Sequence, residues 1–201
     1  MWVIGLIVLP SAVCPLERAS EDELALVNVA ALIPGVLLDI RYATDNNFTK
    51  HVLYSHARCY LRAPVARKLA EAQAALGKQG LRLKIFDCYR PLSVQKKLWR
   101  LVPDERYVAD PKKSSRHNRG AAVDVSLVDA SGREVPMPTG YDDFTERAHR
   151  DYMRLPVAAI KNRALLETIM QQHGFEGLPT EWWHFDFRGW QRFPISDRSI
   201  D

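Results

Sequence analysis

Residues 115–124 have the sequence SRHNRGAAVD, and their last four residues open the apolar stretch Ala121–Leu127, AAVDVSL. The valines and the alternation of this stretch predict a β-strand that carries Asp124. Further out, Leu81–Tyr89 (LRLKIFDCY) alternates polar and apolar residues, and Trp182–Phe187 is rich in aromatic residues. Both patterns are typical of strands. The most polar motif of the chain is therefore expected to adjoin a strand.

Helical spacing of apolar residues marks the stretches around these strands. Leu61–Lys78 predicts one helix, and Pro91 opens a second that runs to Leu101, because proline is tolerated in a first helical turn. Phe144–Tyr152 and Pro156–His173 are also expected to be helical. Strands and helices mix without a regular βαβ rhythm, and the sequence contains no GxGxxG or GxxxxGK[ST] motif. An α+β architecture is predicted, and a nucleotide-binding fold has no support.

Length and composition are those of one globular domain. The 201 residues are 47% hydrophobic and 26% charged, which excludes a disordered chain. The net charge is only +4, and the sequence pI is about 9.0. A nucleic-acid-binding protein usually gathers its Lys and Arg residues into a stripe. The one dense basic stretch, residues 112–119, overlaps the polar motif instead, so we expect no nucleic-acid partner.

Residues 1–20 predict a secretory signal or a lipoprotein-type leader ahead of a domain over residues 21–201. Val3–Leu9 is apolar apart from Gly5, and it is far shorter than the roughly 20 residues of a membrane span. Cys14 follows as in a lipoprotein box, although Val13 stands where a small residue is usual and no basic residue precedes the run. The alternative is an apolar segment packed on the domain. We expect a periplasmic or secreted protein, with a cytoplasmic one as the alternative.

Two short motifs bring together residue types that bind metals. His117 and Asp124 lie in the first motif, and Glu181 and His184 lie in the second, EWWH. A catalytic zinc ion usually takes three protein ligands and leaves one position for water. His117, Asp124 and His184 would form such a set, with Glu181 as a free general base. Taken alone, His117 and Asp124 could equally be a polar pair at a helix cap or a strand end.

Spacing also predicts where two charged residues lie. On a regular strand, positions three apart face opposite sides, so Glu181 is expected at a bend just before the strand that carries His184. Arg90 follows the strand Leu81–Tyr89, in the kind of loop where functional residues are common. Its guanidinium would stabilise an oxyanion or hold a substrate carboxylate, and the alternative is a solvated loop charge.

The ordered pattern S-R-H-x-R-G-x-A-x-D followed by E-W-W-H resembles the D-alanyl-D-alanine dipeptidase family, the VanX-type zinc peptidases. The resemblance covers nearly the whole chain after residue 20. Further blocks that match in order are Arg41–Thr44 with Asn47–Thr49, Ala57–Cys59, Asp87–Pro91, and Met137–Asp142 with Glu146–His149. Several blocks in one order are far more specific than any single block.

The resemblance implies a compact α+β domain in which an antiparallel sheet carries one Zn²⁺ ion and helices pack against it. It implies His117, Asp124 and His184 as zinc ligands, Glu181 as catalytic base and Arg90 as transition-state stabiliser. It further implies that Ser115 and Asp142 hold the termini of a dipeptide, with Asp143 as the alternative to Asp142.

The implied reaction is hydrolysis of D-Ala-D-Ala in the metabolism of cell-wall precursors or peptidoglycan turnover products. One alternative is a zinc D,D-carboxypeptidase that acts on peptidoglycan stem peptides. Another is a non-catalytic, zinc-stabilised peptide-binding module, which the intact Glu181 disfavours because structural zinc sites need no spare base. Cys59 and Cys88 would be able to pair if the protein is exported. No feature of the sequence marks an oligomeric interface.

Overall fold

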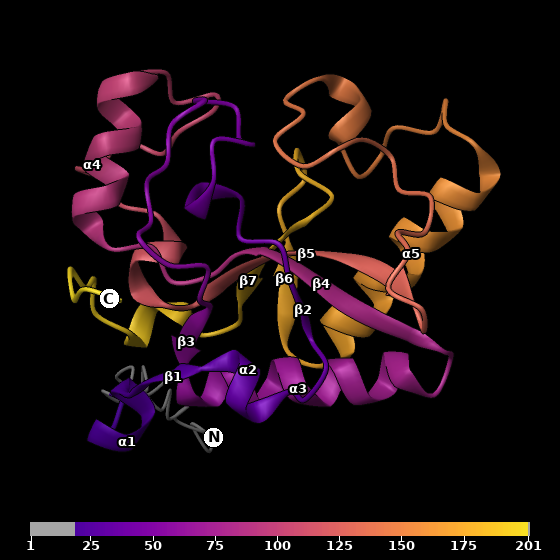
Figure 1. The fold of residues 1–201 in the computed structure, drawn as a ribbon, viewed down its shortest axis with the longest axis horizontal. Helices are drawn as coiled ribbons and strands as arrows, with labels where there is room; N and C mark the ends of the chain where they lie inside the picture. The colour runs from indigo at the N-terminus through magenta and orange to yellow at the C-terminus, as the bar shows by residue number, and fades with distance from the viewer. Residues whose placement is uncertain (1–18, 201) are drawn as a thin grey trace, which may run out of the picture.

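The computed structural model describes residues 19–200, and a five-stranded sheet forms its centre (Figure 1). The strand order is β2-β4-β5-β7-β6. Strands β2 and β4 are parallel, and all other neighbours are antiparallel. The bounds are β2 Leu37–Leu38, β4 Leu81–Asp87, β5 Ala122–Asp129, β6 Phe175–Gly177 and β7 His184–Phe187. The predicted α+β architecture is confirmed, and its three predicted strands are neighbours at the middle of the sheet.

The register of the three middle strands lines up polar residues in one row. Asp124 of β5 lies opposite Asp87 of β4 on one side and opposite His184 of β7 on the other. Directly opposed residues of antiparallel strands project to the same face, with Cβ atoms roughly 5 Å apart. A register shift between Ile85 and Asp87 ends the regular pairing of β4 at this row. The sheet therefore brings together residues that are far apart in the sequence.

Two long helices cover one face of the sheet, α3 (Ala63–Gly77) and α5 (Val157–Gln172) (Figure 1). The helix α3 buries an apolar stripe against the sheet, namely Val65, Ala66, Leu69, Ala72 and Leu76. The third long helix, α4 (Leu92–Leu101), follows β4 after Pro91. The predicted helix over Leu61–Lys78 begins later than expected, because residues 60–62 form the strand β3 (Tyr60–Arg62). That strand pairs with β1 (Leu26–Asn28) in a second, two-stranded sheet. Short helices α1 (Glu21–Leu24) and α2 (Val29–Leu32) flank β1.

The helix predicted over Phe144–Tyr152 is wrong. Only a 3-10 turn, Glu146–Ala148, forms there. The backbone of this segment also bonds to a remote loop: Arg150 N donates to Pro179 O, and Ala148 O accepts from Trp182 N. The segment is therefore fastened to the loop that leads into β7, and these tertiary contacts override its helical spacing.

Cys59 and Cys88 are both buried and form a disulfide, with their Cα atoms 5.3 Å apart. The bridge joins the residue before β3 to the residue after β4. It thus fixes the chain directly beyond Asp87, at the end of the polar row described above.

The leader predicted over residues 1–20 lies outside the described residues except for its last two. Ser20 caps the helix α1 in a capping box with Glu23. Between residues 19 and 200, none of the helices has the length and apolar character needed to cross a membrane.

Candidate active site

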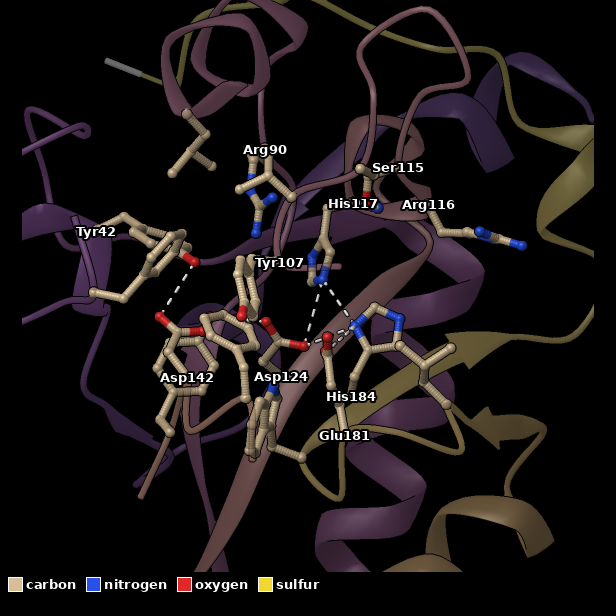
Figure 2. Close-up of a pocket in the computed structure, with 18 of the residues that line it drawn as sticks. Tyr42, Arg90, Tyr107, Ser115, Arg116, His117, Asp124, Asp142, Glu181 and His184 are labelled. Atoms are coloured by element: carbon tan, nitrogen blue, oxygen red, sulfur yellow. Dashed lines mark hydrogen bonds and ion pairs between the residues drawn. The ribbon is translucent and has the colours of Figure 1, made fainter. Parts of the chain in front are cut away.

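A pocket of about 130 Å³ lies at the polar row, where β5 and β7 meet the loops beyond the sheet (Figure 2). It is lined by every residue that the sequence singled out for the site: Arg90, Ser115, His117, Asp124, Asp142, Glu181 and His184. Asp143 is not among the lining residues. The structure therefore brings all seven of these predicted site residues to one place.

Three nitrogen and oxygen atoms converge at the centre of the pocket. His117 Nε2 lies 3.2 Å from His184 Nδ1 and 3.4 Å from Asp124 Oδ1, and the last two atoms are 2.9 Å apart. All three residues are buried. They are the one group of His, Cys, Asp and Glu side chains within residues 19–200 that has the arrangement of a metal site. This triangle is the candidate metal centre.

The short turn that carries His117 is shaped by its two ends. It is a 3-10 helix, Arg116–Arg119, in which the Ser115 side chain caps the first turn and accepts from His117 N. Gly120 ends it with φ of 67°, and a Cβ atom there would lie 2.9 Å from Leu26 Cδ2. The left-handed conformation and the close approach together require glycine. The glycine of the motif therefore turns the chain from His117 into β5.

Each histidine is oriented by the ring nitrogen that faces away from the triangle. His117 Nδ1 lies 2.7 Å from the carbonyl oxygen of Cys88, and His184 Nε2 lies 3.0 Å from Asp186 Oδ1. With a proton on each of these outer nitrogens, the inner nitrogens keep a lone pair for a metal ion. Sequence reasoning missed Asp186, although its position two residues after His184 places both side chains on one face of β7.

The electrostatics of the triangle favour positive charge. Burial disfavours the imidazolium form of His184, but hydrogen bonds with Asp124 and Asp186 outweigh burial and raise its pKa to about 10. Burial also acts against the charged form of Asp124, yet the two histidines hold its pKa well below the usual range. The Tyr141 hydroxyl donates to the other oxygen of Asp124 at 2.9 Å. In the metal-free site the proton on His184 Nδ1 lies between His184 and Asp124, and a metal ion would take its place.

Glu181 lies in the turn that precedes β7, as its spacing from His184 predicted. Its backbone N–H donates to Leu178 O, and its carbonyl accepts from His184 N at 3.4 Å. Its Oε2 atom lies 4.0 Å from His184 Nδ1. Burial raises the pKa of the Glu181 carboxyl. This carboxylate stands beside the triangle without belonging to it, which is the placement of a general base.

Arg90 is buried and is not a solvated loop charge. Its Nη2 and Nε atoms donate to Asp87 Oδ2 at 2.6 and 3.1 Å, and Nη1 donates to Gln95 Oε1 at 2.8 Å. The guanidinium also lies over the ring of Tyr42, 5.1 Å from its centroid. Burial works against the charge, but Asp87 together with Tyr42, Tyr54 and Tyr141 outweighs it and keeps the pKa of Arg90 well above its usual value. A fixed positive charge therefore lines the pocket near His117 (Figure 2).

Asp142 lies on the side of the pocket away from His184 (Figure 2). It has a φ of 58°, and its Oδ2 atom accepts from the Tyr42 hydroxyl at 3.3 Å. Burial, followed by the negative charges of Asp124 and Glu181, raises the pKa of Asp142 well above its usual value. A half-buried carboxylate among other carboxylates is suited to accept a cationic group from a ligand.

Comparison with known proteins agrees with this geometry. The family model described as D-Ala-D-Ala dipeptidase, peptidase M15, matches residues 22–198. A D-alanyl-D-alanine dipeptidase of Escherichia coli is 37% identical over 87% of this chain and 91% of its own. Another from Enterococcus faecium is 30% identical over 78% of this chain and 88% of its own. A solved D,D-pentapeptidase, VanY, superposes with a TM-score of 0.45 and 17% identity over 85% of this chain and 90% of that one. The chain belongs to the peptidase M15 family of D-Ala-D-Ala dipeptidases and is a metallopeptidase.

Proposed function

We propose that this protein hydrolyses the dipeptide D-Ala-D-Ala to two molecules of D-alanine, with one Zn²⁺ ion per chain. The observation that carries the proposal is the arrangement of the pocket: a His-Asp-His triangle with the free carboxylate of Glu181 beside it and a second carboxylate, the half-buried Asp142, on the far side. The family membership and the names of the relatives support the same substrate.

The triangle fits zinc. Two ligand atoms that each lie 2.0–2.1 Å from a tetrahedral zinc ion are about 3.3 Å from one another. The three separations between the ligand atoms of His117, Asp124 and His184 are 2.9, 3.2 and 3.4 Å. Two imidazoles and one carboxylate are also a ligand set that zinc prefers in catalytic sites. When bound, zinc supplies Lewis acidity, which polarises a carbonyl group and lowers the pKa of water.

Glu181 moves the proton of the reaction. Its carboxylate accepts a proton from the attacking water as the new C–O bond forms at the scissile carbonyl carbon. The same carboxyl then gives this proton to the nitrogen of the breaking C–N bond, so that the second D-alanine leaves as an amine. Burial raises the pKa of Glu181, which makes its carboxylate a stronger base toward the attacking water.

Arg90 stabilises the negative charge that develops on the carbonyl oxygen. Asp87 and Gln95 fix its guanidinium from behind, so little reorganisation is needed when the charge appears. Tyr54 in turn donates to Asp87 at 2.8 Å, which satisfies the second carboxylate oxygen. The positive charge of Arg90 is thus held in place by a buried network.

Asp142 and Ser115 recognise the two ends of the dipeptide. The Asp142 carboxylate binds the substrate ammonium group, which relieves its repulsion by Asp124 and Glu181. The Ser115 oxygen already accepts from His117 N, but its hydroxyl proton remains able to donate to a substrate carboxylate. A zwitterionic dipeptide satisfies both groups at once.

The wall of the pocket favours a dipeptide over a stem peptide. Aromatic residues stand on this wall: Phe48, Tyr107 and Phe144. Phe144 packs against Phe48 with ring centroids 5.2 Å apart and against Tyr107 at 4.9 Å. This aromatic wall leaves little room for a longer chain.

Export to the periplasm or the exterior is part of the proposal, with residues 1–20 as the leader. The disulfide between Cys59 and Cys88 supports it, because disulfides persist in oxidising compartments and are rare in the cytosol.

The test is release of free D-alanine from D-Ala-D-Ala by the purified protein, measured with and without a zinc chelator. We expect release that stops with chelator and returns with added zinc. A pentapeptide stem ending in D-Ala-D-Ala and the dipeptide L-Ala-L-Ala serve as comparison substrates. Preference for the stem would replace the proposal with the D,D-carboxypeptidase reading, and binding without turnover would replace it with a peptide-binding module.

A further inference from the structure

Asp186 is not one of the residues proposed as metal ligands, general base or substrate contacts, yet it contacts a metal ligand. It lies on β7 two positions after His184, and its Oδ1 atom is 3.0 Å from His184 Nε2. The other ring nitrogen of His184, Nδ1, points to Asp124 and His117. Only the tautomer with its proton on Nε2 can both donate to Asp186 and offer a lone pair from Nδ1 to a metal ion.

The two histidines of the triangle are held in different ways. His117 offers Nε2 and donates from Nδ1 to a neutral backbone carbonyl, that of Cys88. His184 offers Nδ1 and donates from Nε2 to a carboxylate. A charged acceptor makes the stronger hydrogen bond and increases the electron density on the opposite nitrogen. The orientation of His184 therefore depends on one replaceable side chain, whereas that of His117 depends on the backbone.

Asp186 is itself fixed by the turn that carries the other histidine. Its Oδ2 atom lies 3.5 Å from Arg116 Nε, and the Arg116 guanidinium lies 4.8 Å from the centre of the Trp190 ring. The Asp186 side chain is only 17% exposed, whereas that of Arg116 is 46% exposed. The contacts thus run from Trp190 through Arg116 and Asp186 to His184. Arg116 directly precedes His117 in the sequence.

We infer that Asp186 is a positioning residue that fixes the tautomer and the ring orientation of His184 for metal binding, and that Arg116 holds Asp186 in place. The inference rests on the metal site of the proposed function, and it does not depend on the substrate.

The main test is the zinc affinity of Asp186→Ala, measured by competition with a chromophoric chelator. We expect affinity to fall by about 10–100-fold, the usual effect of removing the outer partner of a histidine ligand. Asp186→Asn keeps an oxygen acceptor without the charge, so we expect it to recover part of this loss. The absorption spectrum of the Co²⁺-substituted protein reports the ligand geometry directly, and we expect it to change in the alanine variant.

Glu176→Ala is the matched control. Glu176 lies directly opposite Asp186 on the neighbouring strand β6, where its contact is an exposed ion pair with Arg188 at 3.1 Å. Its removal takes the same kind of side chain from the same row of the sheet without touching a ligand. We expect zinc affinity and the Co²⁺ spectrum to stay as in the wild type.

Arg116→Ala tests the outer contact and covers the case in which Asp186→Ala does not fold. Because Arg116 is largely exposed, its loss should leave the fold intact and weaken zinc binding by about 2–5-fold, less than the loss of Asp186. Wild-type zinc affinity in both alanine variants would overturn the inference, as would an Asp186→Asn variant as weak as Asp186→Ala. A protein with normal zinc binding but no activity on D-Ala-D-Ala would refute only the proposed function.

Discussion

The two walls of the pocket are built in different ways. The wall that carries the metal site is anchored on the sheet: Asp124 and His184 are cross-strand neighbours on β5 and β7, and Asp87 continues the row on β4. The short turn Arg116–Arg119 adds His117 to it. The opposite wall comes from loops, which supply Asp142 and the aromatic residues Tyr107 and Phe144. Strand register fixes side chains more firmly than loops do, and loops vary more easily. The comparison assigns bond chemistry to the sheet wall and substrate selection to the loop wall.

The two walls also differ in how completely their polar groups are satisfied. On the sheet wall, Asp124 accepts from Tyr141 and contacts both histidines, and Arg90 is paired with Asp87. On the loop wall, Asp142 is half-buried among like charges and receives one hydrogen bond, of 3.3 Å, from Tyr42. A carboxylate that is removed from much of the solvent and has one weak partner is costly in the free protein, and it gains most when a ligand ammonium pairs with it. The loop wall is therefore expected to gain most from the substrate.

The largest effect should come from His184→Ala, which removes a ligand from the sheet wall. We expect loss of zinc and of all measurable dipeptide hydrolysis, because two remaining ligands hold the ion too weakly. Metal content after dialysis, together with D-alanine release, checks this. Retention of stoichiometric zinc by the variant would remove His184 from the metal site and break the assignment of the two walls.

Glu181→Gln should separate chemistry from metal binding within the sheet wall. The amide cannot accept the proton of water, so we expect kcat to fall by about 10²–10⁴-fold. Zinc content should remain that of the wild type, since Glu181 lies 4.0 Å from the nearest ligand nitrogen and is not part of the triangle. Steady-state rates and metal analysis on the same preparation decide the point, and a near-normal rate would exclude Glu181 as the base.

Reduction of the disulfide, which lies beyond the end of the polar row, should lower the stability of the folded protein. Cys59 and Cys88 are 29 positions apart, and a loop of this length predicts about 3–4 kcal/mol of stabilisation from the loss of unfolded-state entropy. A chain of this size should then melt roughly 10 °C lower in reductant.

A Cys59→Ser/Cys88→Ser double variant is the control for this measurement, because its melting temperature should be low and insensitive to reductant. Zinc affinity should fall as well, since the Cys88 carbonyl orients His117. An unchanged melting temperature of the wild type in reductant would contradict the stabilising role of the bridge.

Asp142→Asn should act on substrate binding alone. The neutral amide loses the pairing with the substrate ammonium, and we expect kcat/KM for D-Ala-D-Ala to fall by about 10–100-fold with zinc affinity unchanged. Loss of zinc in this variant would show that the two walls are not independent.

The same variant has a pH signature. Because the folded state raises the pKa of Asp142 above its usual 3.8, the folded protein binds this proton more tightly than the unfolded chain does. Stability should therefore fall as the pH rises from the usual value through the raised pKa, and Asp142→Asn should lose this part of the pH dependence. Melting curves between acidic and neutral pH, recorded for both proteins, provide the measurement. An identical pH dependence in the two proteins would argue against a raised pKa of Asp142.

Features that depend on local sequence could be predicted, and most features that depend on tertiary contacts could not. The middle strands and the helices α3, α4 and α5 follow from local periodicity, and Glu181 before β7 follows from its spacing to His184. Asp87 and Tyr141 could not be assigned, because their contacts with the site arise from strand register and from loops that meet only in the folded chain. The failed helix over Phe144–Tyr152 has the same cause, since its backbone partners lie some 30 residues away. The contact of Asp186 with His184 is local, and its two-residue spacing on a strand was the signal that could have found it.

The smallest effect is expected at Ser115, where the two walls meet. Its hydroxyl oxygen caps the turn of His117, and loss of such a cap costs about 1 kcal/mol. Ser115→Ala should thus lower the melting temperature by about 2–4 °C. If its proton also reaches the substrate carboxylate, KM for the dipeptide rises several-fold as well, while KM for a dipeptide with an amidated C-terminus changes less. A change in stability with no change in either KM would make Ser115 a cap alone and would leave the carboxylate end of the substrate to Arg90.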